Sequence, residues 1–176
     1  MPSCTEFFLA TDDALRHAFA GWREPTGAAL DEAAAPDLSG FEVVEMKSVG
    51  ERRLAQLLVA RGEPYETAQV ECFARCLVAS SGAGATLEVI RIPDRLVDAL
   101  ASSGDEAGGA LAAKWEAVIL EDLASIPNES VRAFETERWT GACVRILSAL
   151  EALVRKRMHG QSLYLLVTGS LGGSAY

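Results

Sequence analysis

The chain has 176 residues, a length typical of one domain with a single sizeable core. Hydrophobic residues make up 49% and charged residues 23%, as in ordinary globular proteins, so the composition excludes a largely disordered chain. The formal net charge of −9 argues against nucleic acid as the main partner, because a phosphate backbone attracts a basic surface. An acidic protein is better suited to a basic protein partner.

No segment has the pattern of a signal peptide or a membrane span. The N-terminus lacks a basic region, and its apolar FFLA run is too short for a signal core. No stretch approaches the roughly 20 apolar residues that cross a bilayer. We therefore expect a cytoplasmic protein without membrane contact, in which the four cysteines stay reduced.

The first forty residues predict a strand, a helix and a long connection. The apolar centre of residues 4–10 is typical of a strand, and Thr11 can cap a helix whose first turn holds two aspartates. This helix is expected to run to about Ala20 and to end at Gly21. Residues 23–40 contain two prolines and many small residues, which predicts a surface connection with one helical turn at Ala28 to Ala34.

A second strand and helix follow this connection. Residues 41–47 alternate apolar and acidic side chains, as expected of a half-solvated strand. Residues 51–61 place three leucines on one helical face, and Gly62 with Pro64 ends that helix.

Residues 65–81 admit two interpretations. They form either one helix or a short helix followed by a strand near residues 74–79. Turn-forming residues at 80–84 and the strand-like residues 86–92 favour a hairpin, which we adopt.

Two helices are predicted next. Pro93 opens the first, which runs through Leu100. Residues 102–109 are interpreted as a loop, unless Asp105 and the glutamate after it begin the second helix early. The second helix ends before Pro127, and its apolar stripe consists of Leu111, Trp115, Val118, Ile119 and Leu123.

The last third of the chain, residues 128–168, carries the strongest pattern. Asn128 can cap one long amphipathic helix, which Gly160 would end with a left-handed residue. Residues 162–168 hold five consecutive apolar residues, as in a central strand that is covered on both faces. The apolar stripe of the helix consists of Val131, Phe134, Trp139, Ala142, Cys143, Ile146, Leu147, Leu150, Leu153 and Val154.

These elements predict an α+β (mixed α/β) fold. We expect a single globular domain over residues 1–168, with a mixed sheet of four or five strands packed by amphipathic helices. The glycine-rich residues 169–176 are expected to form a flexible tail.

The cysteines offer one candidate metal site. On a helix, Cys72 and Cys76 would share a face and supply two ligands, with His17 or His159 completing the set. On a strand the same pair lies too far apart to share one ion. Their apolar neighbours and the absence of a CxxC spacing favour a structural role, as does the position of Cys143 in the helix stripe, so we expect no metal.

Nucleophilic catalysis lacks its usual signature. A cysteine or serine nucleophile needs a base beside it, and the two histidines are better explained as a solvated residue (His17) and a helix-end residue (His159) than as catalytic bases. No G-x-S-x-G turn is present. The TGSLGGS run at residues 168–174 lacks the following helix and lysine of a phosphate loop. We therefore expect no cofactor and favour a protein that is not an enzyme.

The ETERW segment is the most suggestive polar pattern. An acid, an arginine and a tryptophan within five residues are able to line a polar groove, so Glu135, Arg138 and Trp139 are candidate ligand-binding residues together with His17. A solvated helix face with one buried tryptophan explains the same pattern.

Five stretches in order, FFLATDD, VEMKSVGERRLAQLLVARGEPY, IRIPDRLVDALA, KWEAV and RMHGQSLYLLVT, span most of the chain. Together they resemble the YfbM-like proteins, a group of small uncharacterised bacterial proteins, and their actinobacterial relatives. The resemblance implies one mixed α/β domain and supports the hairpin before Pro93. It implies no activity and no functional residues.

Two functions are consistent with these observations. The first is a non-enzymatic intracellular binding or interaction protein, immunity-type or regulatory, whose acidic surface meets a basic partner. The alternative is a small-molecule-binding protein or an enzyme with a cleft where the helices meet the sheet edge.

Overall fold

The computed structural model describes residues 4–24, 36–47, 49–64, 74–80, 85–102 and 105–170. A five-stranded sheet has the order β2-β1-β5-β4-β3, which confirms the predicted single-domain α+β fold. The pairing differs from the expected mixed sheet, because every neighbouring pair is antiparallel. The strands are β1 (Cys4–Ala10), β2 (Val43–Lys47), β3 (Ala74–Ser80), β4 (Ala85–Arg91) and β5 (Ser162–Ser170).

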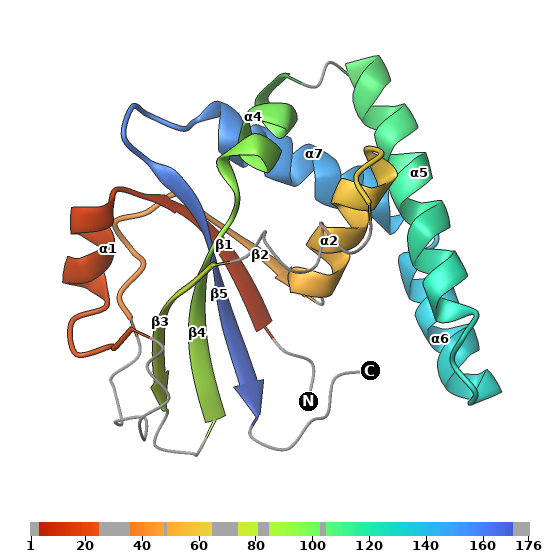
Figure 1. Ribbon diagram of the computed structural model, residues 1–176, viewed down its shortest axis with the longest axis horizontal. Helices are drawn as coiled ribbons and strands as arrows, with labels where there is room; N and C mark the ends of the chain where they lie inside the picture. Colours follow the sequence, from red (N-terminus) through yellow and green to blue (C-terminus); the bar gives the residue numbers. More distant parts are fainter. Residues whose placement is uncertain are drawn as a thin grey trace.

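Helices cover the two faces of the sheet unequally (Figure 1). The short helix α1 (Asp12–Ala18) packs on one face, and the other helices pack on the opposite face. Those are α2 (Glu51–Ala60), α4 (Asp94–Ser102), α5 (Asp105–Leu123), α6 (Glu129–Trp139) and α7 (Ala142–Arg155).

Strand β5 joins the two cores, as predicted for a central strand. Leu163 and Leu165 point into the large core below the helices, whereas Tyr164 and Leu166 point into the small core below α1. All four side chains are at most 5% exposed. Because each large apolar side chain contributes roughly 1.5–3 kcal/mol on burial, this strand and the helices over it contribute much of the folding free energy.

The small core is mainly aromatic. The ring of Phe8 on β1 stacks on Phe19 and on Tyr164, with ring centroids 5.7 and 5.6 Å apart. Trp22, just after α1, meets Phe19 edge-on at 4.9 Å. These contacts hold α1 against the sheet.

The predicted long C-terminal helix is wrong, because the chain breaks between α6 and α7. Gly141 has φ +70°, a left-handed conformation that few other residues adopt, and its amide donates to Glu116 Oε2 at 2.8 Å. Before the break, Val131 and Phe134 are 47% and 63% exposed instead of lying in the core. The apolar period continues across the glycine, which made two helices look like one.

The predicted role of Gly160 is wrong as well. Helix α7 ends at Arg155, with Lys156 as its cap. Gly160 does have a left-handed φ of +80°, but it lies in the turn that leads into β5. Strand β5 continues to Ser170, so residues 169 and 170 belong to the sheet and the rest of the predicted tail lies outside the described residues.

Several predicted helix ends are confirmed. The side chains of Thr11 and Asn128 accept the amides of Ala14 and Val131, as N-caps do. After α2, Gly62 has φ +97° and its amide donates to the Val59 carbonyl at 2.8 Å, as in a glycine C-cap.

The structure decides between the alternatives that the sequence left open at residues 102–109 and, in part, at residues 65–81. Helix α5 begins at Asp105, so the early start is correct and the loop is shorter than predicted. Strands β3 and β4 pair antiparallel, which confirms the strands of the predicted hairpin. Residues 65–73, which include Cys72, lie outside the described residues, and so does the helical turn predicted at 28–34.

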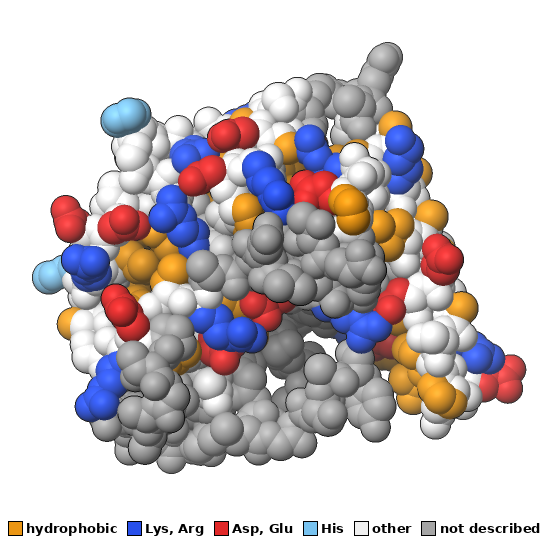
Figure 2. Space-filling model, viewed as in Figure 1, with side chains coloured by type: hydrophobic (Ala, Val, Ile, Leu, Met, Phe, Trp, Pro, Cys, Tyr) orange, Lys and Arg blue, Asp and Glu red, His pale blue; other side chains and the backbone are white. Residues whose placement is uncertain are grey.

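Acidic and basic side chains are interspersed on the face shown in Figure 2, so the described part of that face offers no continuous acidic surface. In the described ranges, no helix combines the length and the hydrophobicity that a membrane crossing requires.

Candidate functional site

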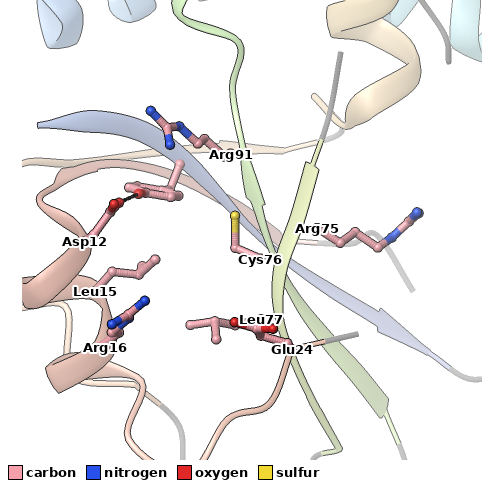
Figure 3. A pocket seen from close by; sticks show the side chains of 9 residues that line it. Asp12, Leu15, Arg16, Glu24, Arg75, Cys76, Leu77 and Arg91 are labelled. Carbon is pink, nitrogen blue, oxygen red and sulfur yellow. Dashed lines mark hydrogen bonds between the residues drawn. The ribbon is translucent and has the colours of Figure 1, made fainter. Parts of the chain in front are cut away.

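A cleft of about 450 Å³ lies between α1 and the open face of strands β3, β4 and β5 (Figure 3). Leu15 and Leu77 provide aliphatic surface, and the remaining lining residues are polar or charged. These are Asp12, Arg16, Glu24, Arg75, Cys76, Arg91 and Tyr164. The volume falls within the range of small-molecule sites.

A hydrogen bond connects the first turn of α1 to a residue near the start of β5. Because Thr11 caps α1, Asp12 is the first helical residue and faces the sheet, where Tyr164 Oη donates to its Oδ1 at 2.7 Å. Burial, together with this hydrogen bond, raises the pKa of Tyr164 above its ordinary value. The phenol therefore stays protonated at neutral pH and serves as a hydrogen-bond donor.

A β-bulge in β3 brings Cys76 into the cleft. The pairing with β4 shifts between Arg75 and Leu77, so Cys76 is an extra residue on the bulged strand. As a result, Cys76 and Leu77 both line the cleft, although neighbours on a regular strand point to opposite faces. Burial raises the pKa of the Cys76 thiol, so a thiolate is disfavoured at neutral pH.

Arg75 itself extends to the other side of β3 (Figure 3). Its guanidinium contacts Glu88 at 3.1 Å and Glu51 of α2 at 3.2 Å. These ion pairs raise the pKa of Arg75, with the hydrogen bond to Glu88 as the largest cause. Its charge is therefore already matched by two carboxylates on the far face of the strand.

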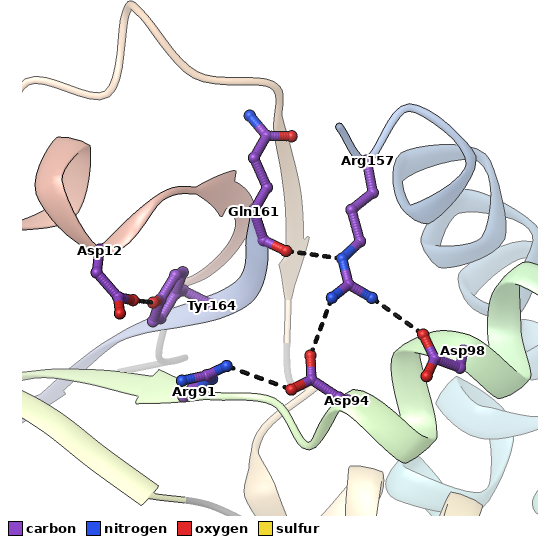
Figure 4. Close-up of polar contacts among 7 residues, drawn as sticks. All are labelled: Asp12, Arg91, Asp94, Asp98, Arg157, Gln161 and Tyr164. Atoms are coloured by element: carbon purple, nitrogen blue, oxygen red, sulfur yellow. Dashed lines mark hydrogen bonds and ion pairs between the residues drawn. The ribbon is translucent and has the colours of Figure 1, made fainter. Parts of the chain in front are cut away.

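Arg91 is held at the rim of the cleft by a chain of ion pairs (Figure 4). It donates to Asp94 Oδ2 at 3.2 Å, and the other oxygen of Asp94 accepts from Arg157 at 3.1 Å. Arg157 also donates to Asp98 at 3.0 Å and to the Gln161 carbonyl at 2.7 Å. The start of α4 and the turn before β5 thereby fix the position of Arg91.

Arg16 is the third arginine that lines the cleft. It lies on the exposed side of α1 and points toward Leu77 (Figure 3). Within the described residues it takes part in no ion pair. An incoming anion therefore meets one unneutralised guanidinium at this wall.

The predicted site residues do not form one site. Glu135 and Arg138 form an ion pair at 3.5 Å on α6, and Trp139 follows at the end of that helix. Arg138 and Trp139 border a separate groove near β2. His17 is exposed on α1, and α1 packs on the opposite face of the sheet from α6 (Figure 1).

Trp139 is mainly a core residue, and only a small part of it reaches the groove near β2. It is 2% exposed, and the Arg53 guanidinium lies over its ring, 5.0 Å from the centroid. Its ring also meets Trp115 edge-on at 6.4 Å. This agrees with the second interpretation of the ETERW segment, a helix face with one buried tryptophan.

Sequence patterns missed most of the cleft. Leu87, Val89 and Arg91 occupy every second position of β4 and so lie on the same face of the strand. An arginine at the end of this apolar face was a pattern in the sequence from which a cation beside the cleft could have been predicted. Tyr164 is the one residue with a polar tip inside the apolar run of β5. Cys76 was considered from the sequence only as a metal ligand, and its position in the cleft depends on the bulge in β3.

Metal coordination finds no support in the described segments, where no group of three potential ligands among His, Cys, Asp and Glu lies together. Cys143 is fully buried, and burial raises the pKa of its thiol to about 12, as expected of a packing residue. No family model, no curated protein and no solved structure matches this chain.

Proposed function

We propose that the chain is a non-enzymatic binding protein of the cytoplasm whose α1-side cleft holds a small ligand with a carboxylate or phosphate group. The proposal depends mainly on Arg16, which forms no ion pair with the described residues and lines a cleft of about 450 Å³ with aliphatic surface from Leu15 and Leu77. Guanidinium groups favour planar oxyanions, because they donate two parallel hydrogen bonds. Asp12 and Glu24 add acceptors for hydroxyl or amino groups of the same ligand.

The protonation states of Cys76 and Tyr164 support a binding role for this cleft over a catalytic one. The Cys76 thiol and the Tyr164 phenol are its candidate nucleophile and base, and burial keeps both protonated at neutral pH. Neither His17 nor His159 lines the cleft. A nucleophile without an adjacent base is weakly reactive, so this site is suited to recognition.

The leading alternative is an interaction protein, immunity-type or regulatory, that meets a basic partner through an acidic surface. It is supported by the net charge of −9. The mixed charges on the face in Figure 2 favour the cleft instead, since they give a basic partner no continuous acidic surface there. The likeness to the YfbM-like proteins stays a prediction.

The test is an NMR titration of the full chain with malonate and, separately, with inorganic phosphate. We expect the largest amide shifts at Arg16, Leu77 and Tyr164. Arg16→Gln should weaken binding about tenfold, because roughly 1.4 kcal/mol of charge-assisted hydrogen bonding is lost. Arg61→Gln is the matched control, an exposed arginine at the end of α2 outside the cleft, and should leave binding unchanged.

Equal weakening in both arginine variants would indicate attraction by charge in general and contradict a defined site. Shifts confined to residues outside the cleft would contradict its location.

A further inference from the structure

Among the described residues, five charged side chains line the cleft beside α1, and two of them are balanced by partners outside it. Arg75 contacts two carboxylates on the far side of β3. Arg91 belongs to a chain of ion pairs in which two arginines meet two aspartates. Asp12, Arg16 and Glu24 form no ion pair with a described residue, so one positive and two negative charges are left for a ligand.

Helix α1 carries two of these three charges on one face. Asp12, Leu15 and Arg16 follow the spacing i, i+3 and i+4, and all three line the cleft. The aspartate and the arginine are spaced for an ion pair along the helix, yet they do not form one. Asp12 accepts from the Tyr164 hydroxyl at 2.7 Å instead, while Arg16 extends toward Leu77 (Figure 3). The two opposite charges therefore stay apart, and both are exposed.

A β-bridge holds Glu24 at the opposite wall. The Arg23 amide donates to the Val78 carbonyl of β3 at 3.1 Å, and the Val78 amide donates back to the Arg23 carbonyl at 2.7 Å. Continuing this antiparallel register places Glu24 opposite Leu77. Residues that lie opposite each other in an antiparallel pair share a face, which agrees with their common position in the cleft.

The two carboxylates act on the same point, the Cys76 thiol. Burial is the largest cause that raises the pKa of Cys76, and the charges of Asp12 and Glu24 add to it, whereas Arg91 opposes them. Because the charge of Arg91 is shared with Asp94, the two carboxylates are free to attract a cation here. An ammonium group suits this position, since it brings three hydrogen-bond donors to carboxylate acceptors.

We propose that the ligand of this cleft is a zwitterion, an α-amino acid with an aliphatic side chain. Its carboxylate binds Arg16, its ammonium group faces Asp12 and Glu24, and its side chain packs on the aliphatic surface of Leu15 and Leu77. The inference rests on the proposed function, which requires an oxyanion, and adds the amine and the aliphatic group. One positive and two negative charges in the cleft favour a ligand that carries an amine as well as a carboxylate.

The test is an NMR titration of the full chain with compounds that share one carbon skeleton. These are L-leucine, 4-methylpentanoate, which lacks the amine, and 3-methylbutylamine, which lacks the carboxylate. Leucine should bind about tenfold more tightly than either of the others, because only leucine meets both kinds of charge. Asp12→Asn and Glu24→Gln should each reduce the preference for leucine over 4-methylpentanoate, and the double variant should lose it.

Both substitutions keep the shape of the side chain. Glu24 is exposed and forms no ion pair with a described residue, so Glu24→Gln decides the question even if Asp12→Asn does not fold. Asp13→Asn is the matched control, an exposed neighbour on α1 outside the cleft, and should leave the preference unchanged.

The possible results distinguish the failure of this inference from the failure of the proposed function. Equal affinities for leucine and 4-methylpentanoate would overturn the amino-acid ligand and leave the anion site standing. Absence of binding by leucine and malonate alike would overturn both. Tighter binding of 3-methylbutylamine than of leucine, or a preference for leucine that persists in the double variant, would also overturn the inference.

Discussion

At the scale of single residues, burial decides which polar groups of the cleft are chemically active. Tyr164 is 1% exposed and keeps its hydroxyl satisfied by donating to Asp12, while its ring stacks on Phe8. The same burial raises its pKa and that of Cys76. Both groups are therefore neutral at neutral pH. We assign them to packing and hydrogen bonding, and we assign the binding of an anion to the exposed Arg16.

The hydrogen bond between Tyr164 and Asp12 yields the first stability prediction. Tyr164→Phe retains the packed ring and removes the hydroxyl, so we expect the free energy of unfolding to fall by about 1 kcal/mol. Urea denaturation measures this change. In a double-mutant cycle, Tyr164→Phe should couple to Asp12→Ala and show no coupling to Asp13→Ala; equal coupling to both would contradict a specific bond.

At the scale of elements, glycine positions explain where the helix predictions succeeded and failed. Gly62 ends α2 as predicted, because a left-handed residue after a helical pattern is a local signal. Gly141 breaks the C-terminal helix in the middle of a continuous apolar period, and its amide is satisfied by Glu116 from the distant helix α5. The second case depends on a tertiary contact that no local pattern contains.

Two adjacent glycines inside α5 give a matched test of packing. A Cβ at Gly109 would meet no atom within 4 Å, so Gly109→Ala should stabilise the protein by about 0.5–1 kcal/mol through helix propensity. A Cβ at Gly108 would lie 3.1 Å from Glu151 Oε1, and that carboxylate is 7% exposed. Gly108→Ala should therefore gain less than its neighbour or lose stability.

Thermal and urea denaturation of both variants check this difference. Equal stabilisation by the two substitutions would mean that Glu151 moves aside freely, and would contradict close packing between α5 and α7.

At the scale of the whole molecule, ion pairs connect neighbouring helices. They help to set the relative positions of these helices, which hydrophobic packing alone specifies less closely. Asp122 of α5 accepts from Arg52 and, at 3.2 Å, from Arg53 of α2. Burial opposes its charge, but hydrogen bonds from Arg52 and Gln56 and the nearby guanidinium charges outweigh burial and lower the pKa of Asp122. Arg53, which is 14% exposed, also covers Trp139 at the end of α6.

This connection predicts a pH-dependent stability. Because the pKa of Asp122 is lowered by folding, its contribution is present above about pH 4 and is lost as the pH falls through the lower folded value. Asp122→Asn should cost about 2 kcal/mol at pH 7, since it removes the carboxylate that pairs with the partly buried Arg53. The difference from the unmodified protein should shrink below pH 4.

Urea denaturation between pH 3 and pH 7 measures the effect of Asp122→Asn. Asp98→Asn is the matched control, because Asp98 is 72% exposed in its pair with Arg157 and should change stability by less than about 0.5 kcal/mol. A constant difference between Asp122→Asn and the unmodified protein across this range would contradict the assignment.

The sequence by itself determined the elements whose signals are local: the strand at residues 4–10, the caps at Thr11 and Asn128, and the buried central strand near the C-terminus. Caps and apolar periods act within a few residues, so they can be read without knowing the fold. Only the tertiary structure decided that Phe134 faces solvent, that Cys76 enters a cleft through a bulge, and that His17 and Trp139 lie on opposite faces of the sheet. Those outcomes depend on which distant segments pack together.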